Sequence, residues 1–219
     1  MPVFQPKKAM ANNKKPSKSR NVNYSGSRLV KEFIDWAEVV VTAVIAVVIL
    51  FTFVFRVVGI DGPSMMKTLN ATYGQTGHTN DMVIISHVMY TPEHGDIVVV
   101  SRNWNNEEFD KESSSETPIV KRIIAVAGDT VEIKFDTGVG LVFVNGEELS
   151  EPYINEPIDP NNVPSTVIWK VPPGKVFLMG DNRNKSLDSR SDRLGPVDER
   201  YILGKVVMRI FPLNEIRMF

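Results

Sequence analysis

IVKRIIAVAGDTVEIKF, residues 119–135, indicates the fold class of this chain more clearly than any other stretch. Two runs rich in valine and isoleucine, 119–127 and 130–135, are separated by Gly128-Asp129. Short β-branched runs bounded by turn residues are typical of β-strands, and neither run has the apolar spacing of a helix. The stretch therefore predicts two consecutive strands.

Similar short runs recur on both sides of this stretch, at residues 82–85, 96–101, 141–145, 166–171, 175–180 and 202–211. Turn signals lie between them, at 136–138, at Asn145-Gly146 and at 172–174. A polar loop is expected at 102–118, and no long helical period follows residue 60. Residues 58–219 are therefore predicted to form an all-β domain of short antiparallel strands.

The other end of the chain carries a different signal. Residues 39–55, VVVTAVIAVVILFTFVF, contain no charge, and the apolar flanks extend this run to the roughly 20 residues that cross a bilayer. A short helical lead-in is expected over 29–37. The run exceeds the ~7–15 apolar residues of a cleaved signal peptide, and no A-x-A site follows it. We therefore predict a permanent transmembrane anchor at 36–57; a buried core helix or a pair of strands is the alternative.

Charge predicts how this anchor is oriented. Residues 1–31 hold eight Lys/Arg and no acid. The first 28 residues should be disordered, and the whole tail and lead-in, residues 1–35, should lie in the cytoplasm. The domain at 58–219 should then lie outside the cytoplasmic membrane. Residues 32–219 carry 17 basic and 26 acidic residues, 17 − 26 = −9, which argues against a nucleic-acid-binding body.

Composition limits the chemistry. The chain has no cysteine and three histidines, which excludes a Cys nucleophile and Cys-ligated zinc and makes a histidine metal site unexpected. We expect neither metal nor cofactor. Catalysis would have to use Ser, Lys, acids or backbone groups.

Ser64, in GIDGPSMMKTL (59–69), follows a Gly-Pro turn and could be presented as a nucleophile. It needs a base, and two lysines are candidates. Lys67 completes an S-x-x-K pattern, but its companion motifs are poor. Lys121 would share a strand face with Ile119 and Ile123, and such apolar walls favour a neutral amine that can accept a proton. A solvated Lys-Arg pair on a strand is the plainer interpretation of Lys121.

The stretch GDNRNKSLDSRSDRLGPV, 180–197, alternates acids and arginines after an apolar strand, which favours a loop held by charge-assisted hydrogen bonds. A polar surface turn is the alternative.

In this order after one N-terminal span, these segments resemble the bacterial type I signal peptidases, membrane-anchored Ser/Lys proteases. GPSMMKTL resembles the family's G-x-S-M-x-P-T-L box and HGDIVVV (94–100) its G-D-I/V-V strand. VKRIIAVAGD (120–129) resembles its V-K-R box, and GDNRNKSLDSR (180–190) matches its G-D-N-R-x-x-S-x-D-S-R box almost letter for letter. VNGEELSEPYI (144–154) and residues 195–206 are also similar to family segments.

The resemblance implies a serine endopeptidase that removes signal peptides from secreted preproteins at the outer face of the cytoplasmic membrane. It implies Ser64 as nucleophile, Lys121 as general base and Ser186 as the residue that orients the base. Five side chains are expected to wall the pocket for small substrate residues: Ile60, Met65, Leu69, Ile119 and Val120. Five are expected to brace the site: Asp188 and Arg190 as an ion pair, with Asp181, Arg183 and Arg122 as further supports.

The resemblance also implies partners: signal peptides, the lipid bilayer and the secretion translocon, with no nucleic acid. Lys67 departs from the family by replacing a proline, and by resemblance alone Lys67→Pro should be tolerated. Gly62 departs by lacking a hydroxyl that would help hold the oxyanion. Two alternatives remain: a catalytically silent membrane-anchored relative acting as chaperone or assembly factor, and a self-cleaving Ser/Lys repressor, which would need a DNA-binding helix pair.

Overall fold

The computed structural model describes residues 25–77, 79–101, 118–136, 138–162, 167–192 and 194–219. Most of the basic tail, most of the polar loop expected at 102–118, and Thr137 of an expected turn lie outside the described residues. The chain divides into two compact units, Met1–Ala46 and Val47–Phe219, and each is described by itself.

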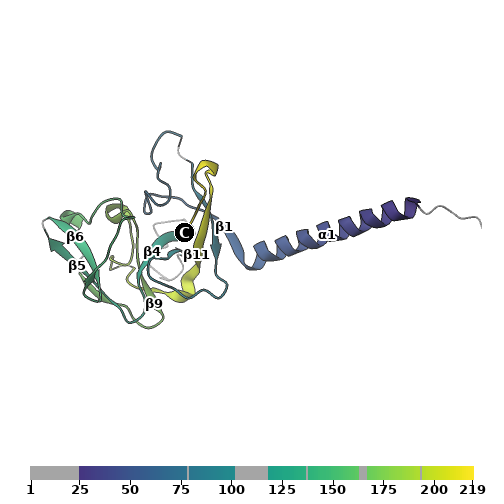
Figure 1. The fold of residues 1–219 in the computed structure, drawn as a ribbon. Coiled ribbons are helices and arrows are strands. Elements are labelled where there is room, and N and C mark those ends of the chain that lie inside the picture. Colours follow the sequence, from purple (N-terminus) through teal and green to yellow (C-terminus); the bar gives the residue numbers. More distant parts are fainter. Residues whose placement is uncertain (1–24, 78, 102–117, 137, 163–166, 193) are drawn as a thin grey trace, which may run out of the picture. The chain divides into compact units, whose positions relative to one another are not determined.

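One long helix, α1 (Ser25–Phe53), occupies the N-terminal part of the described chain (Figure 1). Within the described residues it is the one helix long and apolar enough to span a membrane: Arg28–Phe53 has 26 residues, a mean hydropathy of 2.4 and no buried share. At ~1.5 Å per residue these residues span ~39 Å, which exceeds a ~30 Å hydrocarbon core. The single apolar helix fits a membrane-anchored protein.

The helix limits differ from those expected. α1 starts at Ser25, before the predicted lead-in, and ends at Phe53, whereas the anchor was predicted to continue to residue 57. Phe55, Arg56 and Val57 instead lie on β1 (Phe55–Gly59), which pairs with β2 (Met82–Ser86). Apolar β-branched residues suit either a span or a strand, so the sequence does not mark where one becomes the other.

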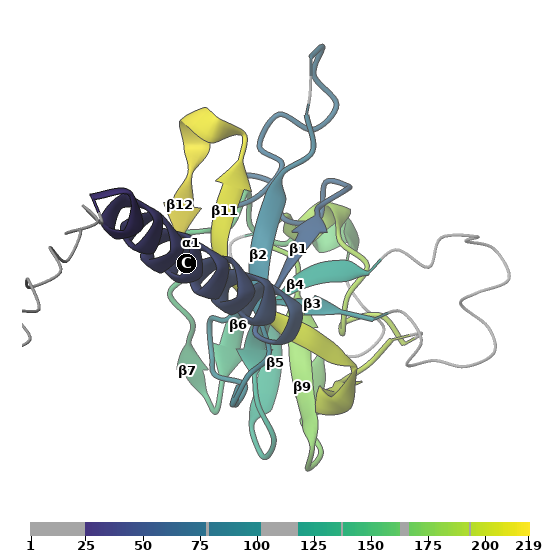
Figure 2. The same cartoon turned by 90° about the vertical axis from the view of Figure 1, so that its right-hand side faces the viewer.

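Among the described residues, the strands form two antiparallel sheets. The larger sheet has eight strands in the order β1-β2-β11-β3-β4-β9-β10, and β12 pairs with β11. Its other members are β3 (Ile97–Val100), β4 (Ile119–Ala125), β9 (Lys175–Met179), β10 (Val197–Asp198), β11 (Ile202–Phe211) and β12 (Arg217–Met218). Figure 2 shows β11 between β12 and β2.

The smaller sheet has four strands in the order β7-β6-β5-β8 within the described part of the chain. These are β5 (Thr130–Asp136), β6 (Val139–Val144), β7 (Glu147–Glu148) and β8 (Ile168–Lys170). Asn145 and Gly146 turn β6 into β7 with φ values of +54° and +86°, the left-handed pair that a tight two-residue hairpin requires. Short 3-10 turns lie at 160–162, 183–185, 199–201 and 213–215.

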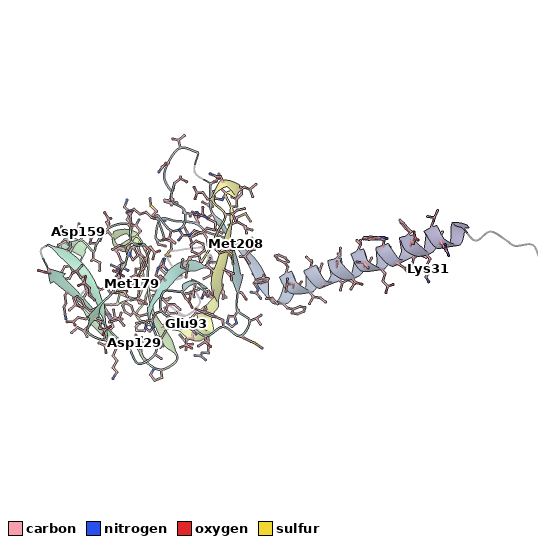
Figure 3. The ribbon with its side chains drawn as sticks, viewed as in Figure 1. Lys31, Glu93, Asp129, Asp159, Met179 and Met208 are labelled. Atoms are coloured by element: carbon pink, nitrogen blue, oxygen red, sulfur yellow. The ribbon has the colours of Figure 1, made fainter. Side chains whose placement is uncertain are left out.

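Three buried apolar clusters stabilise the domain. One joins the two sheets: Ile124 and Phe177 of the larger sheet pack with Val131 and Val142 of the smaller. Met179, labelled in Figure 3, belongs to this cluster. In Figure 1, β4 and β9 accordingly lie between the β5–β6 hairpin and β11.

The predicted fold class is confirmed: one N-terminal helix is followed by short antiparallel strands. Each of the eight apolar runs contains a strand at nearly the expected limits. The strands that sequence patterns did not indicate are β1, hidden in the apolar run, and the two-residue strands β7, β10 and β12.

Candidate active site

Ser64 lies in a compact turn between β1 and β2. The turn begins at Gly62, whose φ of +91° favours glycine, and closes through hydrogen bonds from Met66 N to Pro63 O at 3.1 Å and from Leu69 N to Met65 O at 2.8 Å. The Met65 and Leu69 side chains are buried, while Ser64 is half-buried. The apolar anchors thus fix a turn that leaves the Ser64 hydroxyl at its surface.

Lys121 approaches Ser64 from β4. Its Nζ donates to Ser64 Oγ at 2.8 Å, and the lysine is only 3% exposed. Ile119 and Ile123 pack in one cluster and Val120 in another, as strand alternation requires, and Lys121 shares the face of the two isoleucines. A nucleophile and a candidate base are therefore at hydrogen-bond distance in a mostly apolar setting.

Lys67 lies elsewhere. Its Nζ donates to the main-chain oxygen of Asn155 at 3.0 Å. Its φ of +72° lies in the left-handed region, which the ring of proline, fixed near about −65°, cannot adopt. The expectation that Lys67→Pro should be tolerated is therefore revised: this turn follows a backbone path that the family's proline could not follow.

Arg122 and Asp181 form a bidentate ion pair behind the turn. Arg122 Nε and Nη2 donate to Asp181 Oδ1 and Oδ2 at 2.8 and 2.7 Å, and Nη1 donates to Gly95 O at 2.7 Å. Thr68 Oγ1 donates to Asp181 Oδ2 at 2.5 Å. The guanidinium also stacks 3.9 Å from the centroid of Tyr153. The pair thereby links β4, the nucleophile turn and the loop after β9.

Asp188 and Arg190 form a second buried pair within that loop. Arg190 Nε and Nη2 donate to the two Asp188 oxygens at 2.8 and 2.9 Å, and Gly180 N donates to Asp188 Oδ2 at 3.0 Å. Burial alone would raise the pKa of Asp188, but the guanidinium and the main-chain N–H more than offset burial and lower that pKa. Arg190 Nη2 also donates to Arg183 O at 2.6 Å, which fixes the loop.

Ser186 is not hydrogen-bonded to the Lys121 amine. Its Oγ is buried and has no hydrogen-bond partner among the described residues. It lies against Gly180, where an added Cβ would collide with it and would come within 2.5 Å of the Ser64 carbonyl oxygen. Gly180 is therefore the residue that lets the loop approach Ser64.

The five predicted pocket walls separate into two groups. Ile60, Met65, Leu69 and Val120 share one core cluster and are each at most 6% exposed. Ile119 is half-buried and packs against the cluster on the opposite face of β4. The first four adjoin the Ser64 turn from inside the core.

Two further sets of contacts, made by Asn182 and Arg183, hold the loop after β9. Asn182 N donates to Ser64 O at 3.0 Å and its Nδ2 donates to Pro63 O at 3.1 Å. Arg183 forms a buried bidentate pair with Glu151, with Nη1 to Oε2 at 2.6 Å. Burial opposes the charge, yet the carboxylate raises the pKa of Arg183 above its ordinary value. Arg183 was expected to brace this loop, but its partner Glu151 was not; Asn182 was not singled out, although it lies in the same GDNR motif.

Among the described residues, no three His, Asp or Glu side chains are grouped to hold a metal ion.

Comparisons with known proteins show the family of this chain. The family model for signal peptidase, peptidase S26, matches residues 33–211. Signal peptidase I of Bacillus licheniformis is 32% identical over 192 residues, which cover 84% of this chain and 91% of the relative. Signal peptidase I P of Bacillus subtilis subsp. natto is 35% identical over 198 residues, with 87% and 95% covered.

Similar values hold for signal peptidase IB of Staphylococcus aureus (strain Mu50), at 32% identity over 203 residues, with 85% and 94% covered. Among solved structures, a signal peptidase I from Enterococcus faecalis V583 is 26% identical and covers 54% of this chain and 98% of its own, with a TM-score of 0.39. The chain belongs to the signal peptidase family of serine proteases, peptidase S26.

Proposed function

We propose that this chain cleaves signal peptides from secreted preproteins with Ser64 as nucleophile and Lys121 as general base. The observation that carries this proposal is the 2.8 Å separation of Lys121 Nζ from Ser64 Oγ. A general base must first lie within hydrogen-bond distance of the proton that it removes. Lys67, the competing lysine, is hydrogen-bonded to the main-chain oxygen of Asn155 instead.

The chemistry balances with these two groups. Ser64 Oγ attacks the scissile carbonyl carbon while the neutral Lys121 amine takes the hydroxyl proton. The resulting ammonium gives the proton to the leaving amine, and an acyl-enzyme ester remains. Lys121 then takes a proton from water as the water oxygen attacks the ester, and the proton returns to Ser64 Oγ. Only a deprotonated lysine can start this cycle, and burial favours that form.

The oxyanion would be held by the Ser64 main-chain N–H, since Gly62 offers no side chain. Losing one such donor typically costs ~10²–10³ in rate. We expect Ser186 to orient the Lys121 amine, because its buried hydroxyl and the Ser64 carbonyl oxygen both lie within 2.5 Å of the position that a Cβ on Gly180 would take. Arg122, Asp181, Asp188 and Arg190 hold the surrounding loops and transfer no proton.

The substrate would bind as an added extended strand whose small side chains face the Ser64 turn. The walls proposed for this pocket are Ile60, Met65, Leu69, Ile119 and Val120. The four that share a core cluster would form its floor from beneath the turn.

We place the reaction at the outer face of the cytoplasmic membrane. The basic tail should keep the N-terminus inside, and Ser64 follows the end of α1 by eleven residues, which reach at most ~37 Å. At the outer membrane surface, Ser64 would be close to the bilayer and the secretion translocon, where the cleavage site of a preprotein emerges. Protease added to intact spheroplasts should digest residues 58–219 and spare a tag at residue 1; loss of that tag would invert the topology.

The decisive experiment is cleavage of a synthetic preprotein by the full-length protein in detergent. Wild type should cleave after a small residue, and Ser64→Ala should reduce turnover to background while remaining folded. Ser150→Ala, an exposed serine outside the site, is the matched control and should cleave normally. Unchanged cleavage by Ser64→Ala would refute the nucleophile, and an inactive wild type would favour the silent chaperone-like relative.

A further inference from the structure

A second buried polar cluster lies at the base of the Ser64 turn, outside the Ser64–Lys121 pair. It consists of Asn70, Asp81 and Arg209, which are 1%, 3% and 7% exposed. Asn70 follows the turn, Asp81 precedes β2, and Arg209 lies near the end of β11. Buried charges are rare unless they are paired, so the cluster calls for an explanation.

Asn70 and Asp81 close the turn at both ends. Asn70 Nδ2 donates to Ile60 O at 2.9 Å, and Ile60 N donates to Asp81 O at 2.8 Å. Asn70 N donates to Asp81 Oδ2 at 2.9 Å, while Asp81 N donates to Asn70 Oδ1 at 2.8 Å. These bonds fix the two stems, residues 60 and 70, between which Ser64 is presented.

Arg209 completes the cluster from a distant part of the chain. Its Nη1 donates to Asp81 Oδ2 at 3.0 Å and to Thr68 O at 3.4 Å. On its other side, Nε donates to Glu215 O at 2.8 Å and Nη2 pairs with Glu215 Oε2 at 3.0 Å. The guanidinium is therefore held from β11 and the following 3-10 turn while it neutralises the buried carboxylate that organises the Ser64 turn.

We propose that Arg209 is a positioning residue for the reaction: through Asp81 and Asn70 it holds Ser64 Oγ within reach of Lys121 Nζ. This proposal rests on the proposed function. Without the guanidinium, Asp81 would be a buried unpaired carboxylate, and the turn would have to move to hydrate it. Misplacing a reacting group by about 1 Å can cost ~10²-fold in rate.

A residue that positions the nucleophile should affect kcat more than KM, because it touches neither the substrate nor the reacting atoms. Arg209→Gln should lower kcat at least about tenfold and change KM by less than about threefold, a tenfold change being ~1.4 kcal/mol of activation free energy. Arg209→Lys keeps one charge but loses the fork, so it should lie between Arg209→Gln and wild type.

The test uses the full-length protein in detergent and measures kcat and KM on a synthetic preprotein together with the unfolding temperature. Arg200→Gln is the matched control, since Arg200 forms a bidentate pair with Asp198 but is 84% exposed. Adding guanidinium chloride at low millimolar concentration to Arg209→Ala should recover part of kcat. The double variant Asp81→Asn/Arg209→Gln should lose less kcat than the product of the two single-variant losses.

Normal kcat in folded Arg209→Gln, or a loss equal to that of Arg200→Gln, overturns the proposal. If Arg209→Gln does not fold, Arg209→Lys and the guanidinium rescue decide in its place: unchanged kcat in the lysine variant or no rescue also overturns it. Failure of the dyad itself is seen separately, as cleavage that survives in Ser64→Ala.

Discussion

The main-chain N–H of Asn182 donates a hydrogen bond to the carbonyl oxygen of Ser64 at 3.0 Å, and the Asn182 side chain donates to the neighbouring Pro63 carbonyl. The loop after β9 is therefore hydrogen-bonded directly to the backbone of the nucleophile turn. This contact lies alongside the one that Asp181 makes with Thr68, so two consecutive residues of the loop fasten the turn on both sides of Ser64.

Asn182 should matter through its amide donor. Asn182→Asp replaces the Nδ2 donor with a carboxylate oxygen that faces the Pro63 carbonyl, and turnover should fall more than tenfold. Asn182→Ala loses one hydrogen bond, worth about 1 kcal/mol, and should fall only about fivefold. Asn184→Ala is the control, because Asn184 Nδ2 also donates to a proline carbonyl, Pro157 O at 2.9 Å, but at an exposed position. Equal rates for all three variants would contradict the prediction.

Lys67 gives a test of backbone conformation. Lys67→Pro should lower both stability and turnover, turnover by more than about tenfold, because proline cannot reach the φ of +72° seen here. Lys67→Gly permits that φ and should keep turnover within about threefold although it loses the bond to Asn155. Thermal unfolding and cleavage rates measured on both variants decide the point; a fully active proline variant would mean that the turn changes its path at little cost.

The pH profile tests Lys121 as a base. The kcat/KM should rise with pH as the Lys121 amine loses its proton, because only the neutral amine can accept the proton of the Ser64 hydroxyl. Lys121→Arg keeps the positive charge but cannot lose its proton, so it should abolish turnover. Normal cleavage by Lys121→Arg would exclude Lys121 as the titrating group. The same conclusion would follow if the residual turnover of this variant still rose with pH as in wild type.

Acid stability should depend on Asp188. Its pKa is lowered in the folded protein, so its stabilising contribution is complete above the unfolded value of about 3.9 and is lost as pH falls through the folded pKa. Asp188→Asn should therefore lower the unfolding temperature at pH 7, and the difference from wild type should shrink below about pH 4.

Asp198→Asn is the control for that experiment. Asp198 pairs with Arg200 at the same two-residue spacing, and its pKa is lowered to about 2, but the pair lies in solvent, where screening weakens it. Its replacement should change the unfolding temperature far less. An Asp188→Asn difference that stays constant from pH 7 to pH 3 would show that the loss comes from packing and not from charge.

The local sequence determined the kind of fold and the identity of the chemical groups. Alternating and continuous apolar runs predicted the strands, because side-chain period and β-branching act over a few residues. The motifs around Ser64, Lys121 and Asp188 pointed to the site, since each lies within one short box. Arg209 gave a weaker signal: it is one of two charges, with Lys205, inside the largely apolar run 202–211, and alternation alone could have assigned it to either face.

Tertiary structure decided what depends on separations of tens of residues. Which lysine reaches Ser64 was settled by the pairing of β3, β4 and β9, which brings residue 121 to the turn across 57 residues. The end of α1 was settled by the pairing of β1 with β2, because the apolar run itself suits helix and strand alike. The buried polar cluster of Asn70, Asp81 and Arg209 depends on tertiary structure in the same way, because its hydrogen bonds join residues that only the folded sheet brings together.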